Sequence, residues 1–387
     1  MSDKRFERLS QIPWFSRESL ASKSAIVIGS GALGNWLLPH LVLNGIGCVL
    51  IVDKDVIEES NLPRSPLFTQ GDIGEPKARV AARKLRSLDP EVSVHSIVGD
   101  VQWDVGLANF KYADVVCGAV DSRLARLRIN HKAWVTNTPF IDGGIDGPSL
   151  TGRIRTFIPR KGACLECSMY PQDYELLERE YPCTDDAGTG APTMSTIAAV
   201  TSSLEVNEAL KLLLGMEDRL RAGCELRWDL MHNTFIETQI PRRSGCYFDH
   251  DSLIGETIVL TKPVDRLTLS EVFELAAEEL GAEATLEFSR DIVTALVCEN
   301  CGDCKKTLRV LGKISRQETE CRCFGRLHPL TYVHSLTRGD LEVLPYLNLS
   351  LSEIGIPSGD IISAHSLGSS EEIFIEFVGA LTKNGGR

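Results

Sequence analysis

The chain has 387 residues, more than one hydrophobic core usually serves, so we expect two domains. Its 41 lysines and arginines are outnumbered by 53 aspartates and glutamates, and the net charge of −12 argues against a general binder of nucleic acid or anionic membranes. No apolar run reaches the roughly 18 residues of a membrane span, and the first residues lack the apolar segment of a secretion signal. We therefore expect a soluble, cytoplasmic protein whose partners are small molecules or proteins.

The first half of the chain alternates between strand-like and helix-like segments. Apolar runs at 24–28 and 47–53 flank a helical stretch that begins near Ala32. A second helix is expected from Pro76 to the Asp89-Pro90 pair, because proline favours the first helical position and also stops a helix. The alternation then continues with strand-like runs at 92–98, 113–120 and 139–145 and a helix over 122–135. This pattern is typical of a doubly wound α/β sheet.

The alternation lapses beyond residue 168, where a polar, proline-bounded stretch predicts a long loop. A helix ending at Gly215 and two strand-like segments follow. We place the domain boundary near residue 252, which gives a larger α/β domain over 1–252 and a smaller α+β domain over 253–387.

A glycine-rich loop follows the first predicted strand. The glycines at 29, 31 and 34 suit a tight strand-to-helix turn whose backbone can approach a phosphate at the helix N-terminus. Asp53 ends the second strand, where an acid can bind the ribose hydroxyls of a nucleotide. A dinucleotide and ATP both fit these residues.

The charged residues that follow favour ATP. Asn61 and Arg64 lie in a loop after the second strand, Lys77 begins a helix, and Asp121 follows another strand. Two cations and a carboxylate near one phosphate site suit a triphosphate with Mg²⁺ better than a dinucleotide. Arg64 and Lys77 would stabilise charge in the transition state of attack on the α-phosphate, and Asp121 would hold the metal.

Several segments together resemble the ThiF/MoeB/ubiquitin-activating superfamily, whose members adenylate the C-terminal glycine of a ubiquitin-like protein. In chain order they are RFER at 5–8, GSGALG, VDKD, SNLPR, GEPK, DSRLAR, CLEC and EALKLLLG, and they span roughly residues 5–250. The resemblance implies a Rossmann-like adenylation domain that uses ATP and Mg²⁺. It also implies that Arg8 reaches the active site of a second subunit, and hence a homodimer.

Cysteine spacing predicts two zinc sites. Cys164 and Cys167 form a metal knuckle, and the superfamily closes this site with a second cysteine pair, of which only Cys246 is present. Cys-x-x-x-His falls within known half-site spacings, so we favour His250 as the fourth ligand over Asp249. The alternative is a vacant site in which Cys246 is simply buried.

A second cluster lies in the smaller domain. Over a zinc-ribbon-like segment at 296–326, the predicted ligands are Cys298, Cys301, Cys321 and Cys323, with Cys304 left over. A redox relay is the rival interpretation, disfavoured because no thioredoxin-like context surrounds the cysteines.

Cys183 lies in the long loop, where activating enzymes of this superfamily often keep a nucleophilic cysteine. A thiol there could attack the acyl adenylate and form a thioester. Asp185 and Asp186 argue against it, since they disfavour a thiolate. A loop cysteine without function is the alternative.

We therefore expect an ATP-dependent activator of a ubiquitin-like or sulfur-carrier protein. The segment LSLSEIGIPSGDII weakly resembles the β-grasp-like appendage with which ubiquitin-activating enzymes dock a conjugating enzyme, although an unrelated dimerisation or stability domain fits as well. Two rival functions remain: adenylation of a peptide or small carboxylate, and a non-catalytic scaffold. Intact Arg64, Lys77 and Asp121 disfavour the scaffold.

Overall fold

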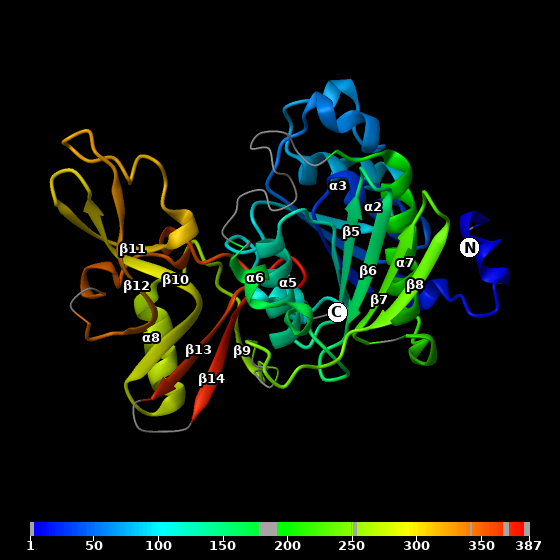
Figure 1. Cartoon of the computed structure of the whole chain (residues 1–387). Coiled ribbons are helices and arrows are strands. Elements are labelled where there is room, and N and C mark those ends of the chain that lie inside the picture. Colours follow the sequence, from blue (N-terminus) through cyan, green and yellow to red (C-terminus); the bar gives the residue numbers. More distant parts are fainter. Residues whose placement is uncertain are drawn as a thin grey trace. The chain divides into compact units, whose positions relative to one another are not determined.

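The computed structural model describes residues 4–175, 177, 192–220, 222–248, 250, 254–340, 343–366 and 371–382. The chain forms two compact units (Figure 1). Unit 1 comprises Met1–Gln102 and Phe110–Leu253, and unit 2 comprises Trp103–Asn109 and Ile254–Arg387. Within the described ranges, every helix is too short or too polar to cross a membrane.

Unit 1 is built on an eight-stranded sheet in the order β3-β2-β1-β4-β5-β6-β7-β8. The strands from β3 to β5 run parallel, and β6, β7 and β8 extend the sheet in antiparallel fashion. Their bounds are β1 Ser24–Ile28, β2 Cys48–Asp53, β3 Ser93–Val98, β4 Val115–Gly118, β5 Phe140–Asp146, β6 Thr151–Phe157, β7 Cys224–Asp229 and β8 Thr234–Gln239. This arrangement confirms the predicted doubly wound α/β fold.

The central strands are nearly continuous apolar runs, as parallel strands covered on both faces must be. The helices of this part of the chain are α1 Arg17–Ala21, α2 Ala32–Leu43, α3 Lys77–Leu88, α4 Leu107–Lys111, α5 Arg123–Val135, α6 Pro171–Glu175 and α7 Ser195–Leu213. Residues of α2, α3 and α7 pack with β1 and β2 into one buried core. The chain leaves α7 through Gly215, whose φ of +69° suits a glycine after a helix end.

Unit 2 has a six-stranded mixed sheet with one long helix packed on it. Its elements are β9 Thr257–Leu260, α8 Leu269–Leu280, β10 Ala284–Cys298, β11 Cys304–Val310, β12 Leu327–Thr337, α9 Leu351–Ile354, β13 Ile361–Ser366 and β14 Glu372–Phe377. The strand order is β11-β10-β13-β14-β9, and β12 also pairs with β10.

One segment falls outside the sequence-based division. Residues 103–109 group with unit 2, because the backbone N–H of Leu107 donates to Asp360 at 3.2 Å and that of Ala108 donates to Gly359 at 2.8 Å. A single domain boundary near residue 252 does not include these residues in the smaller unit.

Candidate functional site

The glycine-rich loop joins β1 to α2 at the carboxyl edge of the parallel sheet. A Cβ atom on Gly29 would lie 2.4 Å from the carbonyl oxygen of Ala119, and one on Gly34 would lie 2.0 Å from that of Gly29. These two glycines are required by close backbone packing. A Cβ on Gly31 would meet nothing within 4 Å among the described atoms, so space remains beside the N-terminus of α2. Such a position suits an anionic group.

Asp53 ends β2 beside this loop. Its carboxylate accepts hydrogen bonds from the backbone N–H of Ser30 at 2.6 Å, from the Ser30 hydroxyl at 2.9 Å and from the backbone N–H of Asp55 at 2.9 Å. Burial raises the pKa of Asp53 above its usual range, although the nearby Lys77 charge opposes the shift. The carboxylate is therefore held rigidly at the strand end.

Lys77 is the first residue of α3, and its side chain is only 11% exposed. Its Nζ lies 3.1 Å from Oδ2 of Asp55, and its backbone N–H donates to the Asp55 carbonyl at 2.9 Å. The ammonium group is thus fixed at the same edge as Asp53, with few alternative positions.

Carboxylates also gather beside Lys54, a second lysine at this edge of the sheet. Lys54 follows β2 and its Nζ lies 3.0 Å from Oδ2 of Asp100. Burial opposes protonation of Lys54, but Asp100, Asp55 and Asp121 together raise its pKa above the usual range. Asp121 follows β4, so the structure brings it to the same edge as the residues after β2. Carboxylate oxygens are among the ligands that Mg²⁺ prefers.

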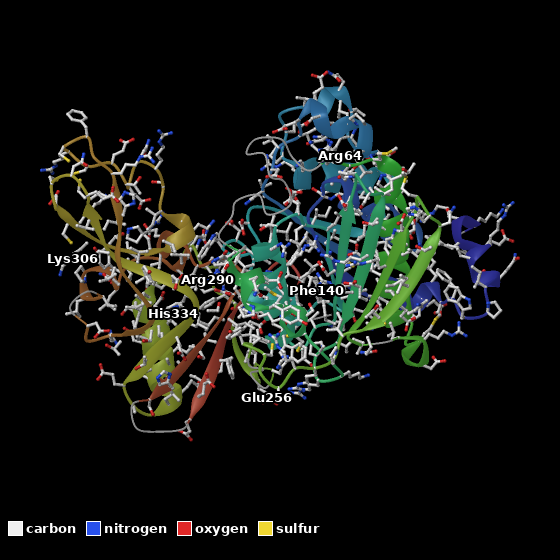
Figure 2. All side chains as sticks on the ribbon, viewed as in Figure 1. Arg64, Phe140, Glu256, Arg290, Lys306 and His334 are labelled. Atoms are coloured by element: carbon white, nitrogen blue, oxygen red, sulfur yellow. The ribbon has the colours of Figure 1, made fainter. Side chains whose placement is uncertain are left out.

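Asn61 and Arg64 lie on the 3₁₀ helix Glu59–Arg64, also beyond β2. The Asn61 side-chain oxygen accepts from the backbone N–H of Glu58 at 3.1 Å, which closes the start of this turn. Arg64 donates to the carbonyl of Ser60 at 2.8 Å, and Figure 2 shows it on the segment that follows β2. The structure ties this guanidinium to its own turn.

Arg8 lies elsewhere in the described structure. The ring of Phe6, in the same N-terminal segment, approaches Gly45, which precedes β2. Arg5 pairs at 2.9 Å with Asp89, which precedes β3. The segment therefore packs at the amino edge of the sheet, opposite the predicted nucleotide site of the same chain.

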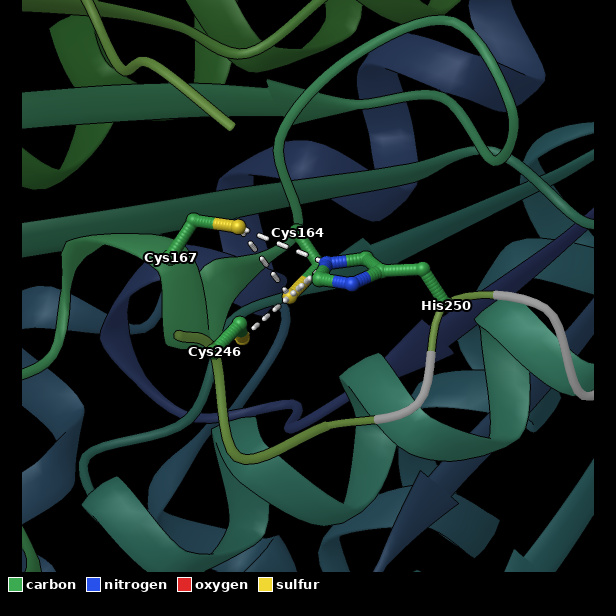
Figure 3. A group of neighbouring side chains, drawn as sticks. All are labelled: Cys164, Cys167, Cys246 and His250. Carbon is green, nitrogen blue, oxygen red and sulfur yellow. Dashed lines mark hydrogen bonds between the residues drawn. The ribbon is translucent and has the colours of Figure 1, made fainter. Parts of the chain in front are cut away.

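Figure 3 shows a metal-ligand cluster within unit 1: Cys164, Cys167, Cys246 and His250. Cys164 Sγ lies 3.9 Å from Cys167 Sγ and 3.8 Å from Cys246 Sγ. His250 Nε2 lies 3.1 Å from Cys164 Sγ and 3.4 Å from Cys167 Sγ. Sulfurs about 2.3 Å from a shared tetrahedral zinc would be about 3.8 Å apart, so these spacings fit a metal ion.

The surroundings hold these ligands in place. The Trp134 indole N–H donates to the His250 carbonyl at 2.7 Å, and the Arg243 backbone N–H approaches Cys167 Sγ at 3.5 Å. Asp249, the alternative fourth ligand, lies outside the described residues. Among the described residues, His250 offers the fourth candidate ligand atom of the cluster.

A second metal-ligand cluster lies in unit 2 and joins Cys298, Cys301, Cys321 and Cys323. Sγ atoms of Cys298 and Cys323 are 3.5 Å apart, and those of Cys301 and Cys321 are 3.6 Å apart. A Cβ on Gly325 would lie 2.9 Å from Cys298 Sγ, so this glycine makes room for the sulfur. Cys304 does not belong to the cluster, in agreement with the sequence prediction.

Comparison with known proteins assigns the chain to a family. The model of the ThiF family matches residues 6–248. The chain belongs to the ThiF family. A sulfur carrier protein adenylyltransferase of Thermus thermophilus is 32% identical over 241 residues, which cover 62% of this chain and 86% of that protein. A SAMP-activating enzyme E1 of Haloferax volcanii is 32% identical over 228 residues, covering 58% and 79%.

Among solved structures, Escherichia coli MccB with ATP is similar to this ThiF-family chain, with a TM-score of 0.53 and 20% sequence identity. The match covers 64% of this chain and 74% of MccB, and it shows a shared fold. The named relatives at higher identity are adenylyltransferases. This chain is an adenylyltransferase enzyme.

Sequence reasoning missed a buried charged network in the ThiF-family domain. Asp142 on β5 is fully buried and contacts Arg126 of α5 and Arg155 of β6, the latter at 2.7 Å. Burial opposes its ionisation, but these guanidinium groups hold the pKa of Asp142 below its usual range. The pair of glycines that follows Asp142 was the available signal.

Two further observations delimit the candidate site. Cys183 lies outside the described residues, so the structure does not place it. A hollow of about 460 Å³ lined by Lys23, Asp114 and Leu213 lies at the amino edge of the sheet and contains none of the predicted site residues. The candidate site is therefore the carboxyl edge, where the glycine loop and Lys77 meet.

Proposed function

We propose that this enzyme uses ATP and Mg²⁺ to adenylate the C-terminal glycine of a ubiquitin-like or sulfur-carrier protein. The names of its relatives support the substrate class: they act on sulfur carrier proteins in bacteria, and another is a NEDD8-activating enzyme subunit. In the reaction a carboxylate oxygen attacks the α-phosphorus of ATP, and pyrophosphate leaves.

The observation that carries this proposal is the fixed cation beside an open backbone cradle. Gly31 leaves space at the start of α2, and Lys77 Nζ is held near Asp53 and Asp55 at the same edge. Two anions must approach each other in the reaction, so Lys77 and Arg64 would offset their repulsion. Asp121 would hold Mg²⁺, while Asp53 and Asn61 would position the nucleotide.

Pyrophosphate exchange tests this assignment. The acyl partner is first captured on the purified enzyme with ATP and Mg²⁺, and its C-terminus is sequenced. Lys77→Ala and Asp121→Ala should each lower exchange with that partner by at least ~10²-fold, the scale of losing one electrostatic stabiliser. Lys84→Ala is the matched control, because Lys84 lies on the same helix and pairs with Asp72 at 3.2 Å. Unchanged exchange in both site variants would overturn the assignment.

The captured partner also decides between substrate classes. A small folded protein ending in glycine supports carrier activation. A short peptide or a small carboxylate as the sole substrate supports the alternative, in which the same domain adenylates a peptide.

We further propose that Cys183 accepts the acyl group. Its thiolate would attack the acyl carbonyl, the bond to AMP would break, and a thioester would form while the thiol proton passes to solvent. On a non-reducing gel, enzyme, ATP, Mg²⁺ and partner should give a covalent band that reductant removes and Cys183→Ala abolishes, while exchange persists. A band that survives in this variant assigns the thioester to another cysteine.

The place of Arg8 supports a homodimer. The segment that carries it packs at the amino edge of its own sheet, so the catalytic role predicted for Arg8 would require the site of a second subunit. Mixing Arg8→Ala chains with Lys77→Ala chains should restore part of the exchange activity, since one of the two sites then has both residues.

Unit 2 would dock a conjugating enzyme. Deletion of residues 254–387 tests this role, because it should abolish transfer of the acyl group while pyrophosphate exchange is retained.

We assign zinc to both cysteine clusters. The first would join residues from 164–167 to residues 246–250 across unit 1, and the second would join the ends of β10 and β12 in unit 2. Cysteine and histidine are the ligands that a closed structural zinc site uses.

A further inference from the structure

Four arginines share two carboxylates on one face of the sheet in unit 1. Asp142 contacts Arg126 and Arg155, while Glu225 lies 3.2 Å from Arg227, 3.9 Å from Arg155 and 4.0 Å from Arg153. Four positive and two negative charges leave an excess of two positive charges. We call these four arginines the arginine cluster; they are Arg126, Arg153, Arg155 and Arg227.

The antiparallel register places these side chains together. Arg155 of β6 stands opposite Asp142 of β5 and Glu225 of β7. Arg153 stands opposite Gly144 and Arg227 in the same way. Residues directly opposite each other in neighbouring strands share a face, so the cluster lies on one face of β5, β6 and β7. Arg126 is buried and the Arg155 side chain is only 11% exposed, so Arg153 and Arg227 are the members that an outside group can reach.

Arg153 is the least compensated member of the arginine cluster. Its Nε is buried and has no hydrogen-bond partner among the described residues. Its guanidinium lies over Gly144, where an added Cβ would come within 3.3 Å. Burial, Arg155 and Arg126 together lower the pKa of Arg153 to about 10. Its side chain is nevertheless 35% exposed, so an external anion can reach it.

The arginine cluster begins beside the candidate nucleotide site. Arg126 donates to the carbonyl of Val120, the residue before Asp121, and Asp142 pairs in register with Gly118 at the end of β4. From β5 to β7 the surface extends about 10 Å at a strand spacing of about 4.8 Å, the length of about three residues of extended chain. A polypeptide whose last carboxylate lay at the site could thus place side chains over the cluster.

We propose that the arginine cluster binds acidic side chains in the C-terminal tail of the acyl donor, about three to five residues before its terminal glycine. Carboxylates there would form charge-assisted hydrogen bonds with guanidinium groups that the described residues leave undercompensated. Because charge complementarity acts chiefly on specificity, the cluster would select among proteins that share a terminal glycine. This inference rests on the proposed adenylation of such a tail.

Peptide binding tests it without requiring catalysis. Two hexapeptides ending in Gly-Gly, one with glutamates and one with glutamines three and four residues before the terminal glycine, are titrated by calorimetry into the full chain. We expect the glutamate peptide to bind about tenfold more tightly or better, and to lose this advantage as salt increases. Arg153→Gln and Arg227→Gln should each remove most of the preference.

Three controls keep the result specific. Arg242→Gln removes an exposed arginine beyond β8 and should leave the preference unchanged. Arg153→Lys keeps the positive charge and should therefore retain part of the preference for the glutamate peptide that Arg153→Gln loses. ATP affinity should be unaffected in Arg227→Gln.

The outcomes separate this inference from the proposed function. Equal binding of the two peptides, or a preference that persists in both glutamine variants, overturns it. If the two glutamine variants bind ATP more weakly but keep the preference for the glutamate peptide, the inference is also overturned, and the cluster is assigned to the nucleotide. The enzyme could also prefer the glutamate peptide through Arg153 and yet show no pyrophosphate exchange. That outcome supports recognition of the tail by the cluster and contradicts only the proposed adenylation of the tail.

Discussion

The two units differ in how their buried charged groups are paired. In unit 2, Arg290 and Asp360 are almost completely buried as a one-to-one pair, with Arg290 Nη2 3.0 Å from each carboxylate oxygen. In unit 1, four arginines share two carboxylates, and the fully buried Glu205 has no hydrogen-bond partner among the described residues. Unmatched polar groups lower stability, so their concentration beside a candidate site is a sign of function. The matched pair in unit 2 joins β10 to the residue that precedes β13.

The largest expected effect comes from the metal-ligand clusters, because structural zinc binding contributes on the order of 10 kcal/mol to folding of its site. Elemental analysis should give two zinc ions per chain. Cys298→Ser should remove one and Cys246→Ser the other, while the neighbouring Cys304→Ser should remove none. One zinc that Cys298→Ser abolishes would show that the cluster in unit 1 binds no metal.

The clusters should also differ in how fast they lose metal. In unit 2, Cys301 and Cys323 are exposed, whereas Cys164, Cys167 and His250 of unit 1 are buried. A chelator should therefore remove metal first from unit 2, leaving pyrophosphate exchange intact at that stage. Loss of exchange together with the first zinc would contradict the assignment of catalysis to unit 1.

The next effect concerns the matched pair of unit 2. Asp360→Ala leaves the Arg290 charge buried without its partner, which should cost about 3–5 kcal/mol. It also removes the acceptor for the Leu107 backbone N–H, so residues 103–109 should be held less firmly, although the bond from Ala108 to Gly359 remains. Hydrogen exchange of peptides from β10 and β13 should rise accordingly, while the peptides of β1 and β2 keep their protection.

Asp265→Ala is the control for this change, because Asp265 is an exposed acid of the same unit. Equal protection of β10 and β13 in the Asp360 and Asp265 variants would show that the pair contributes nothing to unit 2.

The sequence predicted the parts of this molecule that depend on local pattern. Apolar runs predicted β1 and β2, and cysteine spacing predicted the two groups of residues whose candidate ligand atoms lie together in the structure. Segment 103–109 could not be predicted to join unit 2, because its bonds reach Asp360, 253 positions away from Leu107. The roles of Arg64, Lys77 and Asp121 stay predictions.

The arginine cluster escaped prediction for a related reason. Arg126, Arg153 and Arg227 become neighbours only through the register of three strands and one helix, which no short motif encodes. Glu205 stands in the helix sequence SLEVNEAL and resembles any surface acid there. Only the fold shows that its carboxyl group faces Gly143, where an added Cβ would lie 2.2 Å from Oε2.

The last prediction tests this unmatched acid directly. Burial and the negative charge of Asp142 raise the pKa of Glu205 well above its usual range, so the native state keeps a proton that the unfolded chain releases. The free energy of unfolding therefore falls as pH rises above the usual glutamate pKa, by about 1.4 kcal/mol per pH unit until the native group ionises. Glu205→Gln is neutral at every pH and should remove this decline, so the variant should gain stability over the native chain between pH 5 and pH 8.

Urea unfolding at pH 5 and at pH 8 measures this difference in the free energy of unfolding. Glu208→Gln replaces a neighbouring acid that pairs with Lys211, and it should show no such gain. A Glu205→Gln protein that is less stable than the native chain at pH 8 would mean that the carboxylate is ionised and paired, and the contrast between the two units would fail.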